Sequence, residues 1–296
     1  MAQSANSTYT FDLEAFRREF PIIPVSYDLA QLGDVCGPSA LVEIEHYRHI
    51  LGAHLFDVER RPVDVFTWSI GEPPDRHVTK IGGVPYRSAE LPWPTSPNGA
   101  PRCFLAQFCF TDSVFPASGL PGCTLLIFVD DTYSDDWNAA SFYLEWQPAG
   151  LTHLVSEREL PPRSIELPSL FGVRHRSIDL VSPLPEEALE GVVTPFQLEF
   201  QTPAEVAWNL ACFDATKIGG VPAFPLAGSL GNERLLCSLI SMFPSIGVRF
   251  PYVNHEAACC SMSELPSFSP GGGYFRLAVA LSQNGRMTPH FHYEYC

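Results

Sequence analysis

The heptapeptide Thr79-Lys80-Ile81-Gly82-Gly83-Val84-Pro85 recurs without change as Thr216-Lys217-Ile218-Gly219-Gly220-Val221-Pro222 in this chain of 296 residues. An identical run of seven residues indicates an internal repeat, because chance composition rarely produces one. Segments downstream of the two copies also correspond in sequence, namely Gly122–Asp130 with Gly273–Leu281 and Phe142–Trp146 with Phe291–Tyr295. We therefore predict two copies of one β-rich unit.

The repeat also holds all the lysine of the chain. Lys80 and Lys217 are the only lysines, and every other basic residue is arginine. An ammonium group is compact and rotatable, whereas a guanidinium group is planar and larger. We expect both positions to require an ammonium group.

The glycine pair after each lysine defines a candidate ligand site. Glycine allows positive φ, and successive amides in such a turn can form an anion-binding nest that the lysine would complete for phosphate or carboxylate. The alternative is architectural: each ammonium group caps carbonyls or pairs with a carboxylate of the core, and the turn fixes the start of a strand. The candidate residues of the two turns are Lys80, Gly82, Gly83, Lys217, Gly219 and Gly220.

Trp93 and Gln107 complete the candidate ligand-binding set. Gln107 lies in an apolar run, so its side chain must be hydrogen-bonded, either to the backbone of the lysine turn or to a ligand. Trp93 stands between two prolines and would serve either as an aromatic residue of a binding groove or as a lid over the core.

The sequence predicts an α+β fold, in which an N-terminal helical segment packs on two related, mainly antiparallel β-sheet units that share one core. Apolar spacing predicts helices over Phe11–Phe20 and from Ser39 to Leu55. After Pro62, short β-rich runs alternate with Gly, Pro, Asn and Asp. The predicted strands are Val63–Ser69, Cys103–Phe110, Cys123–Asp130, Phe142–Gln147, Leu235–Met242, Tyr274–Leu281 and His290–Tyr295.

Four segments follow from this pattern. They are an N-terminal helical segment (1–62), a first β-rich unit (63–155), a connecting segment (156–200) and a second β-rich unit (201–296). The connecting segment is rich in Pro, Glu and Arg, which predicts a surface connection with a short helix near Glu186–Leu189. A capping box at Thr202 predicts a helix that extends to Ala211.

Charge and cysteine content restrict the possible partners and compartment. The net charge of −15 disfavours binding to nucleic acid or to anionic membrane surfaces. No apolar run is long enough for a membrane helix, and Met1–Thr10 lacks the features of a secretion signal. The nine cysteines contain no C-x-x-C pair, which favours a reduced, cytoplasmic protein. Free thiols are expected within apolar runs at Cys103, Cys109, Cys123 and Cys237.

Searches for chemical motifs predict neither a metal nor a cofactor. His255-Glu256-Ala257-Ala258-Cys259 approaches the H-E-x-x-H spacing but lacks the second histidine. Asp130–Asp136 contains four carboxylates without the order of a calcium loop, which favours a solvated hairpin tip over a loose cation site. Phosphate-loop, dinucleotide-binding and G-x-S-x-G motifs are absent from the sequence, and we find no catalytic motif.

The chain resembles the YwqG-like family of uncharacterised proteins over roughly residues 40–296. The residues that carry the resemblance are Lys80–Pro85, Trp93-Pro94, Gly99–Pro101, Phe104–Gln107 and Lys217–Pro222. The resemblance implies a fold rather than a mechanism, because the family has no established activity; some relatives lie beside bacterial toxin–immunity genes. The chain departs from the family pattern at Leu235–Ile240, which contains no glutamine.

Three functions are compatible with these observations. The first is a cytoplasmic protein-binding module, of an adaptor or immunity-like kind, that engages a protein partner through acidic loops and the groove between the units. The second is a small-molecule or anion-binding protein that uses the twin lysine turns. The third is a hydrolase whose residues are dispersed in the sequence, which would gather titratable groups in a deep pocket.

Overall fold

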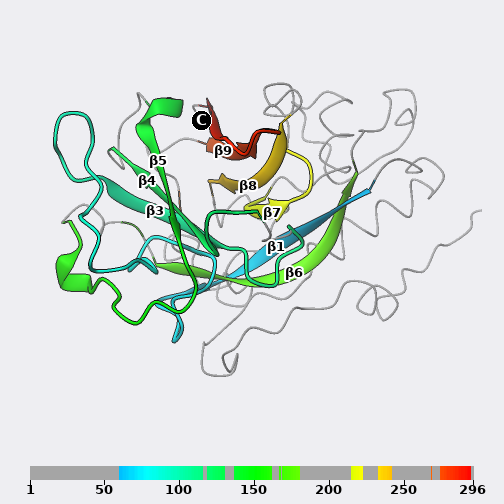
Figure 1. Ribbon diagram of the computed structural model, residues 1–296. Helices are drawn as coiled ribbons and strands as arrows, with labels where there is room; N and C mark the ends of the chain where they lie inside the picture. The colour runs from blue at the N-terminus through cyan, green and yellow to red at the C-terminus, as the bar shows by residue number, and fades with distance from the viewer. Residues whose placement is uncertain are drawn as a thin grey trace, which may run out of the picture.

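The computed structural model describes residues 60–115, 119–130, 137–161, 167, 169–180, 215–222, 233–241, 268 and 274–294. These residues form one ten-stranded sheet in which neighbouring strands are antiparallel (Figure 1). The strands are β1 (Arg60–Ile70), β2 (Lys80–Ile81), β3 (Cys103–Cys109), β4 (Thr124–Val129), β5 (Phe142–Gln147), β6 (Leu170–Leu180), β7 (Lys217–Gly219), β8 (Arg234–Ile240), β9 (Tyr274–Leu281) and β10 (Met287–Glu294).

The predicted α+β fold with an N-terminal helical segment is wrong for the structure as described. Two short 3-10 helices, η3 (Ala139–Ser141) and η4 (Glu157–Glu159), are the only helices among the described residues. Short apolar runs separated by Gly, Pro and Asn suit strands and turns, and strands from both predicted units lie in a single sheet. The predicted helices at Phe11–Phe20, Ser39–Leu55, Glu186–Leu189 and Thr202–Ala211 lie outside the described residues.

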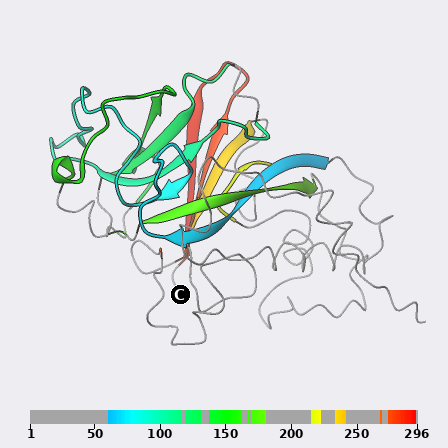
Figure 2. The same ribbon diagram turned by 90° about the horizontal axis from the view of Figure 1, so that it is seen from below.

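The strand order is symmetric about the pair β1 and β6. It runs β10-β9-β8-β7-β1-β6-β2-β3-β4-β5. The first half of the sheet consists of β6, β2, β3, β4 and β5, and the second half consists of β1, β7, β8, β9 and β10. Each half therefore has one long strand, one short strand that begins with lysine, and three further strands. The long strands are exchanged between the halves: β1 pairs with β7, and β6 pairs with β2. In Figure 2, β1 and β6 lie side by side beneath the other strands. Because of this exchange, the two halves form one continuous sheet.

Strand register is similar in the two halves of the sheet. Lys80 lies opposite Gln107, and Lys217 lies opposite Ser238. Each of the strands that follow has one register shift at the corresponding place. These shifts fall between Phe104 and Ala106 in β3 and between Leu235 and Cys237 in β8. A bulge retained at one position in both halves is a built feature of the unit.

The predicted correspondence of the last strands is wrong by four residues. Phe142 begins β5 opposite Val129, whereas Met287 begins β10 opposite Leu281. Register therefore matches Phe142 with Met287, and not with Phe291. The error arises because aromatic residues recur along both strands, so a short sequence alignment has more than one good match.

The long strand β6 lies within the range 156–200 that the sequence assigned to a surface connection. It pairs with β1 over eleven positions, from Arg60 opposite Leu180 to Ile70 opposite Leu170. Its middle carries Arg174 and Arg176, which gave the segment its polar character in the sequence. The strand nevertheless occupies the centre of the sheet.

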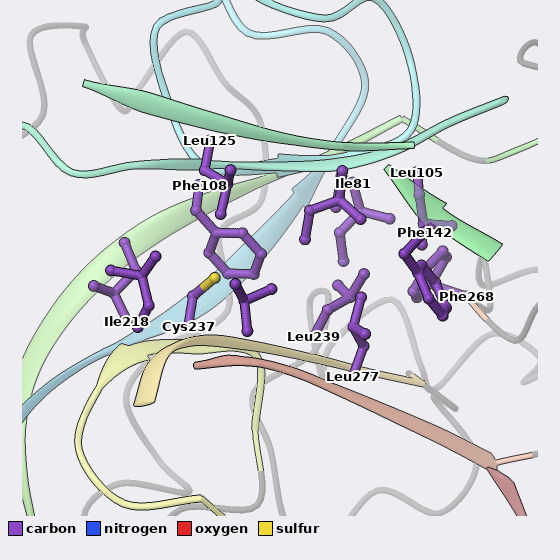
Figure 3. Packing of buried hydrophobic residues seen from close by; sticks show 14 of the residues in the cluster. Ile81, Leu105, Phe108, Leu125, Phe142, Ile218, Cys237, Leu239, Phe268 and Leu277 are labelled. Atoms are coloured by element: carbon purple, nitrogen blue, oxygen red, sulfur yellow. The ribbon is translucent and has the colours of Figure 1, made fainter. Parts of the chain in front are cut away.

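The sheet curls so that its two halves face each other across one hydrophobic core. Figure 3 shows side chains of the first half, such as Phe108 and Leu105, facing Cys237 and Leu239 of the second half. Side chains of the two outermost strands also meet, with the rings of Phe142 and Phe291 centred 5.3 Å apart. Two halves that bury one common core are expected to unfold together.

Candidate functional site

The first lysine turn holds the carboxylate of Glu72, which follows β1. The fully buried Lys80 donates from Nζ to Oε2 of Glu72 and to the carbonyl of Val84, the latter at 3.0 Å. Oε1 of Glu72 accepts hydrogen bonds from the N–H of Val84 at 2.9 Å and from the hydroxyl of Ser169 at 2.7 Å. The Glu72 side chain is 40% exposed, so this ion pair is open to solvent on one side.

Burial shifts the titration of this lysine. Desolvation lowers the pKa of Lys80, and the nearby carboxylate of Glu72 opposes the shift. The buried ammonium group of Lys80 therefore depends on the carboxylate of Glu72 to stabilise its charged form.

The second lysine turn holds the carboxylate of Asp179, near the end of β6. Oδ2 of Asp179 accepts hydrogen bonds from Nζ of Lys217 at 2.7 Å and from the N–H of Val221 at 2.9 Å. Val84 and Val221 occupy the same place in the two heptapeptides, so the same two donors act in both turns. Here both charged side chains are fully buried.

The second glycine of each pair permits the carboxylate to approach. Gly83 has φ +63° and Gly220 has φ +72°, a region that side-chain-bearing residues rarely adopt. A Cβ atom at Gly83 would also overlap Glu72 and Ser169, and one at Gly220 would overlap Asp179. In each Lys-x-Gly-Gly turn, a carboxylate of the same chain therefore occupies the backbone nest. This is the alternative in which the ammonium group pairs with a carboxylate of the protein and not with a ligand.

Gln107 bonds to the backbone on both sides of the first turn. Its side-chain nitrogen donates to the carbonyls of Arg76 and Val78, each at 2.7 Å, and its oxygen accepts from the N–H of Tyr86 at 2.7 Å. The side chain is fully buried. It therefore connects the segment before the lysine turn to the segment after it. Hydrogen bonding to the backbone of the lysine turn is one of the two roles expected for Gln107 from the sequence.

Ser238 takes the place of Gln107 in the second half. Its hydroxyl donates to the carbonyl of Ala215 at 2.8 Å, which matches the bond from Gln107 to Val78. The glutamine missing from Leu235–Ile240 is thus replaced by a shorter side chain that makes one of the corresponding bonds.

Trp93 packs as a lid on the outer face of the first half. Its indole N–H donates to the carbonyl of Arg102 at 2.7 Å, and its ring meets Phe128 edge-on with centroids 5.5 Å apart. Beneath it lies a small buried cluster of Phe104, Leu126 and Phe128. Trp93 is only partly buried, so part of the residue remains accessible.

Arg87 fixes the loop that carries Trp93. It binds Glu145 of β5 with two hydrogen bonds, of 2.7 and 3.1 Å, and donates to the carbonyls of Leu91 and Pro92. The Arg87 side chain is 2% exposed. A buried, bidentate ion pair of this kind positions the loop firmly.

A further buried charge lies where β1 meets β6. Asp64 is fully buried, with Nε of Arg174 3.6 Å and Nε of Arg176 3.7 Å from its carboxylate oxygens. Its Oδ2 also accepts a hydrogen bond from the N–H of Val114 at 2.8 Å. Desolvation raises the pKa of Asp64, and the two arginines and Val114 oppose that rise.

Sequence reasoning did not identify the partners of the candidate residues. Glu72 lies eight residues before Lys80, whereas Asp179 lies 38 residues before Lys217, so no fixed spacing marks the carboxylates. Arg87 and Glu145 were likewise missed, since they are 58 residues apart. A buried lysine needs a carboxylate, but only the sheet register shows which one.

Several motifs named from the sequence are not covered by the structure. His255–Cys259 and 131–136 of the acidic loop lie outside the described residues. Within the described part, no three His, Cys, Asp or Glu side chains gather as metal ligands do. The four cysteines there, Cys103, Cys109, Cys123 and Cys237, are free thiols, as predicted.

Comparison with protein families gives one match. Residues 79–169 fit a family described as "Domain of unknown function (DUF1963)". The match begins at the first lysine turn and ends just before β6, so it covers most of the first half and not the second. The YwqG-like resemblance itself remains a prediction. No curated protein matches the chain. No helix in the described part has the length and apolar character needed to cross a membrane.

Proposed function

We propose that the chain is a protein-binding module that engages a basic protein through the Trp93 face, the outer surface formed by Leu91, Trp93 and Tyr143 and supported by the buried Arg102. The observation that carries the proposal is exposure. Leu91 and Tyr143, at 44% and 42%, are the exposed large hydrophobic side chains of the described residues. Leu91 lies two residues before Trp93, and Tyr143 is connected to Trp93 through Phe128. Exposed apolar surface of this kind is typical of an interaction site.

The two aromatic rings of the Trp93 face rest on one buried side chain. The ring of the buried Phe128 meets Trp93 at 5.5 Å on one side and Tyr143 at 6.2 Å on the other. The guanidinium of Arg102 lies over the Tyr143 ring at 5.6 Å. Trp and Tyr are among the residue types that contribute most to binding energy in interfaces.

The face is also held in place before any partner arrives. Arg87 anchors the carbonyls of Leu91 and Pro92 to Glu145 on β5. A preorganised surface loses little conformational entropy on binding, which favours affinity.

Charge supports a basic partner. The chain has a net charge of −15, while Arg87 and Arg102 are internally paired with Glu145 and Asp130. A field of this sign accelerates association with positively charged proteins and repels acidic ones. An adaptor or immunity-like role would use this property.

The two lysine turns do not favour the anion-binding alternative. Each nest is filled by Glu72 or Asp179, which supports architecture over ligand capture. The dispersed hydrolase lacks a supporting observation of its own.

Site-specific cross-linking tests the proposal. A photoreactive phenylalanine analogue at Tyr143 is compared with the same analogue at His153, an exposed control position. The partner captured from Tyr143 is then purified, and its affinity is measured for the wild type, Leu91→Ser, Tyr143→Ser and the control His153→Ser. We expect a basic protein and a loss of affinity of about tenfold or more for the first two variants only. Equal capture at both positions, or unchanged affinity, would contradict it.

A further inference from the structure

The two ends of the sheet form a seam that is distinct from the lysine turns. β5 and β10 stand at opposite ends of the strand order, yet their inward side chains meet. The rings of Phe142 and Phe291 are centred 5.3 Å apart, and the indole N–H of Trp146 donates to Sδ of Met287 at 3.1 Å. The two strands therefore touch through side chains, although they are not hydrogen-bonded neighbours in the described sheet.

The backbone at the edge of β5 is open to pairing. The N–H of Asp130 donates to the carbonyl of Ser141 at 3.2 Å, in the register of the pair formed by β4 and β5. In an antiparallel pair, successive residues direct their backbone groups alternately toward the neighbour and away from it. The backbone groups of Phe142, Leu144 and Trp146 are thus directed away from β4, and no strand of the described sheet pairs with this edge.

Apolar side chains are incompletely covered along the same seam. Leu144 and Trp146 of β5, and Met287 and Phe291 of β10, pack against the core but are only partly buried. The apolar side chains of the neighbouring strand β4 are, in contrast, fully buried. An unpaired strand edge beside partly open apolar surface is the kind of place to which a further strand adds.

Of the two edges at the seam, that of β5 is the better template. The N–H of Ser282 donates to the carbonyl of Arg286 at 2.9 Å, and the alternation from this pair along β10 directs the backbone of Pro289 toward the seam. Proline has no N–H to donate, so it interrupts the edge of β10. β5 contains no proline. An incoming strand is therefore expected to pair with β5.

Carboxylates lie on the outer side of both strands. Side chains alternate along a strand, so Tyr143 and Glu145 face outward from β5, where Glu145 binds Arg87. On β10, the ring of His290 lies 2.8 Å from the carboxylate of Glu233. Together with the net charge of −15, these carboxylates favour basic side chains at the outward positions of an added strand.

We propose that an extended segment of the basic partner, in which apolar and basic residues alternate, adds to β5 as an antiparallel strand and covers the seam. The inference rests on the proposed function, because Tyr143 of the Trp93 face belongs to the same strand. Apolar residues of the segment lie beside Leu144 and Trp146, and basic residues lie beside Tyr143 and Glu145. Backbone hydrogen bonds supply affinity in this mode of binding, and the alternating side chains supply specificity.

The test uses the full chain and a short fluorescent peptide of alternating valine and lysine, whose binding is measured by anisotropy. In an antiparallel pair, valines opposite Phe142, Leu144 and Trp146 donate their N–H groups to β5, whereas the lysines donate away from it. We expect N-methylation of the valines to weaken binding about tenfold or more, and N-methylation of the lysines to have little effect. The unmodified peptide should also slow hydrogen exchange of the three β5 amides, measured by NMR.

Three results would overturn the proposal. Equal binding of the two N-methylated peptides would show that charge alone attracts them. Slow exchange of the amides of Phe142, Leu144 and Trp146 before peptide is added would show that the edge is already paired within the chain. Exchange that slows with rising protein concentration would instead assign the edge to a second copy.

Cross-linking from Tyr143 separates this inference from the proposed function. Capture of a basic protein from Tyr143, together with equal binding of the two N-methylated peptides, refutes strand addition and leaves the Trp93 face as the interface. Capture that is equal at Tyr143 and at the control position His153 refutes the proposed function, whatever the peptides show.

Discussion

The two lysine turns have one sequence and one set of donors, yet they differ in how far their ion pairs are exposed. In the first, Lys80 holds a Glu72 side chain that is 40% exposed; in the second, Lys217 holds an Asp179 that solvent does not reach. The longer glutamate reaches the nest from beyond the end of β1, while the shorter aspartate lies within β6. The heptapeptide thus specifies the nest. The carboxylate comes from the long strand that is not paired with the lysine strand: Glu72 follows β1, whereas β2 pairs with β6, and Asp179 belongs to β6, whereas β7 pairs with β1.

Replacement of the lysine should give the largest difference in stability between the two turns. Lys217→Met leaves the charge of Asp179 buried without its cation, and we expect a loss of about 3–5 kcal/mol in the free energy of unfolding. Lys80→Met should cost less, about 1–2 kcal/mol, because water can reach Glu72. Urea unfolding of the two variants measures the difference, and an equal or larger loss for Lys80→Met would contradict the comparison.

Addition of a methyl group to the second glycine tests the nest itself. Gly220→Ala places Cβ against Asp179 at φ +72°, so both strain and overlap oppose it, and we expect a loss of about 2–4 kcal/mol. Gly285→Ala is the matched control, since it has φ +81° with open space around it, and strain alone costs about 1 kcal/mol. Thermal or urea unfolding compares them; equal losses would show that the carboxylate does not occupy the nest.

The side chains opposite the two lysines, Gln107 and Ser238, should also contribute unequally to the free energy of unfolding. Gln107→Ala leaves the carbonyls of Arg76 and Val78 and the N–H of Tyr86 without this partner, for which we expect about 2–3 kcal/mol. Ser238→Ala affects one carbonyl and should cost about 1 kcal/mol. Unfolding free energies provide the check, and a smaller effect at Gln107 than at Ser238 would count against the assigned correspondence.

The smallest expected effect is a pH dependence. Burial lowers the pKa of Lys80 from the value of 10.5, so between the folded pKa and 10.5 the unfolded chain binds more protons. Stability of the wild type should therefore rise with pH across this window relative to Lys80→Met, in which the group is absent. Urea unfolding from neutral pH to pH ~10 follows this difference; a difference that shrinks with rising pH would reverse the assigned sign.

Local sequence signals predicted much of the fold. The seven strands expected from Val63 to Tyr295 all occur in the described residues, because each is a short apolar run between turn residues. The identical heptapeptides lie at corresponding places in the strand order, each at the short strand beside a long one. The central strand β6 was missed because Arg174 and Arg176 make it look like a surface segment, although Arg174 is buried against Asp64.

The site was less predictable than the fold. The restriction of lysine to two places indicated a special environment, and the turn glycines were identified for the right geometric reason. The carboxylates could not be identified, because Glu72 and Asp179 come from different positions of exchanged long strands.

Because the chain contains only two lysines, their ammonium groups can be observed individually. The direct measurement is a heteronuclear NMR spectrum of protein labelled with ¹⁵N in lysine side chains, with Lys80→Arg and Lys217→Arg used for assignment. The account predicts two separate ammonium signals, both protected from exchange with water and the one from Lys217 protected more. A single, rapidly exchanging signal typical of free lysine would show that the two amines do not hold internal carboxylates.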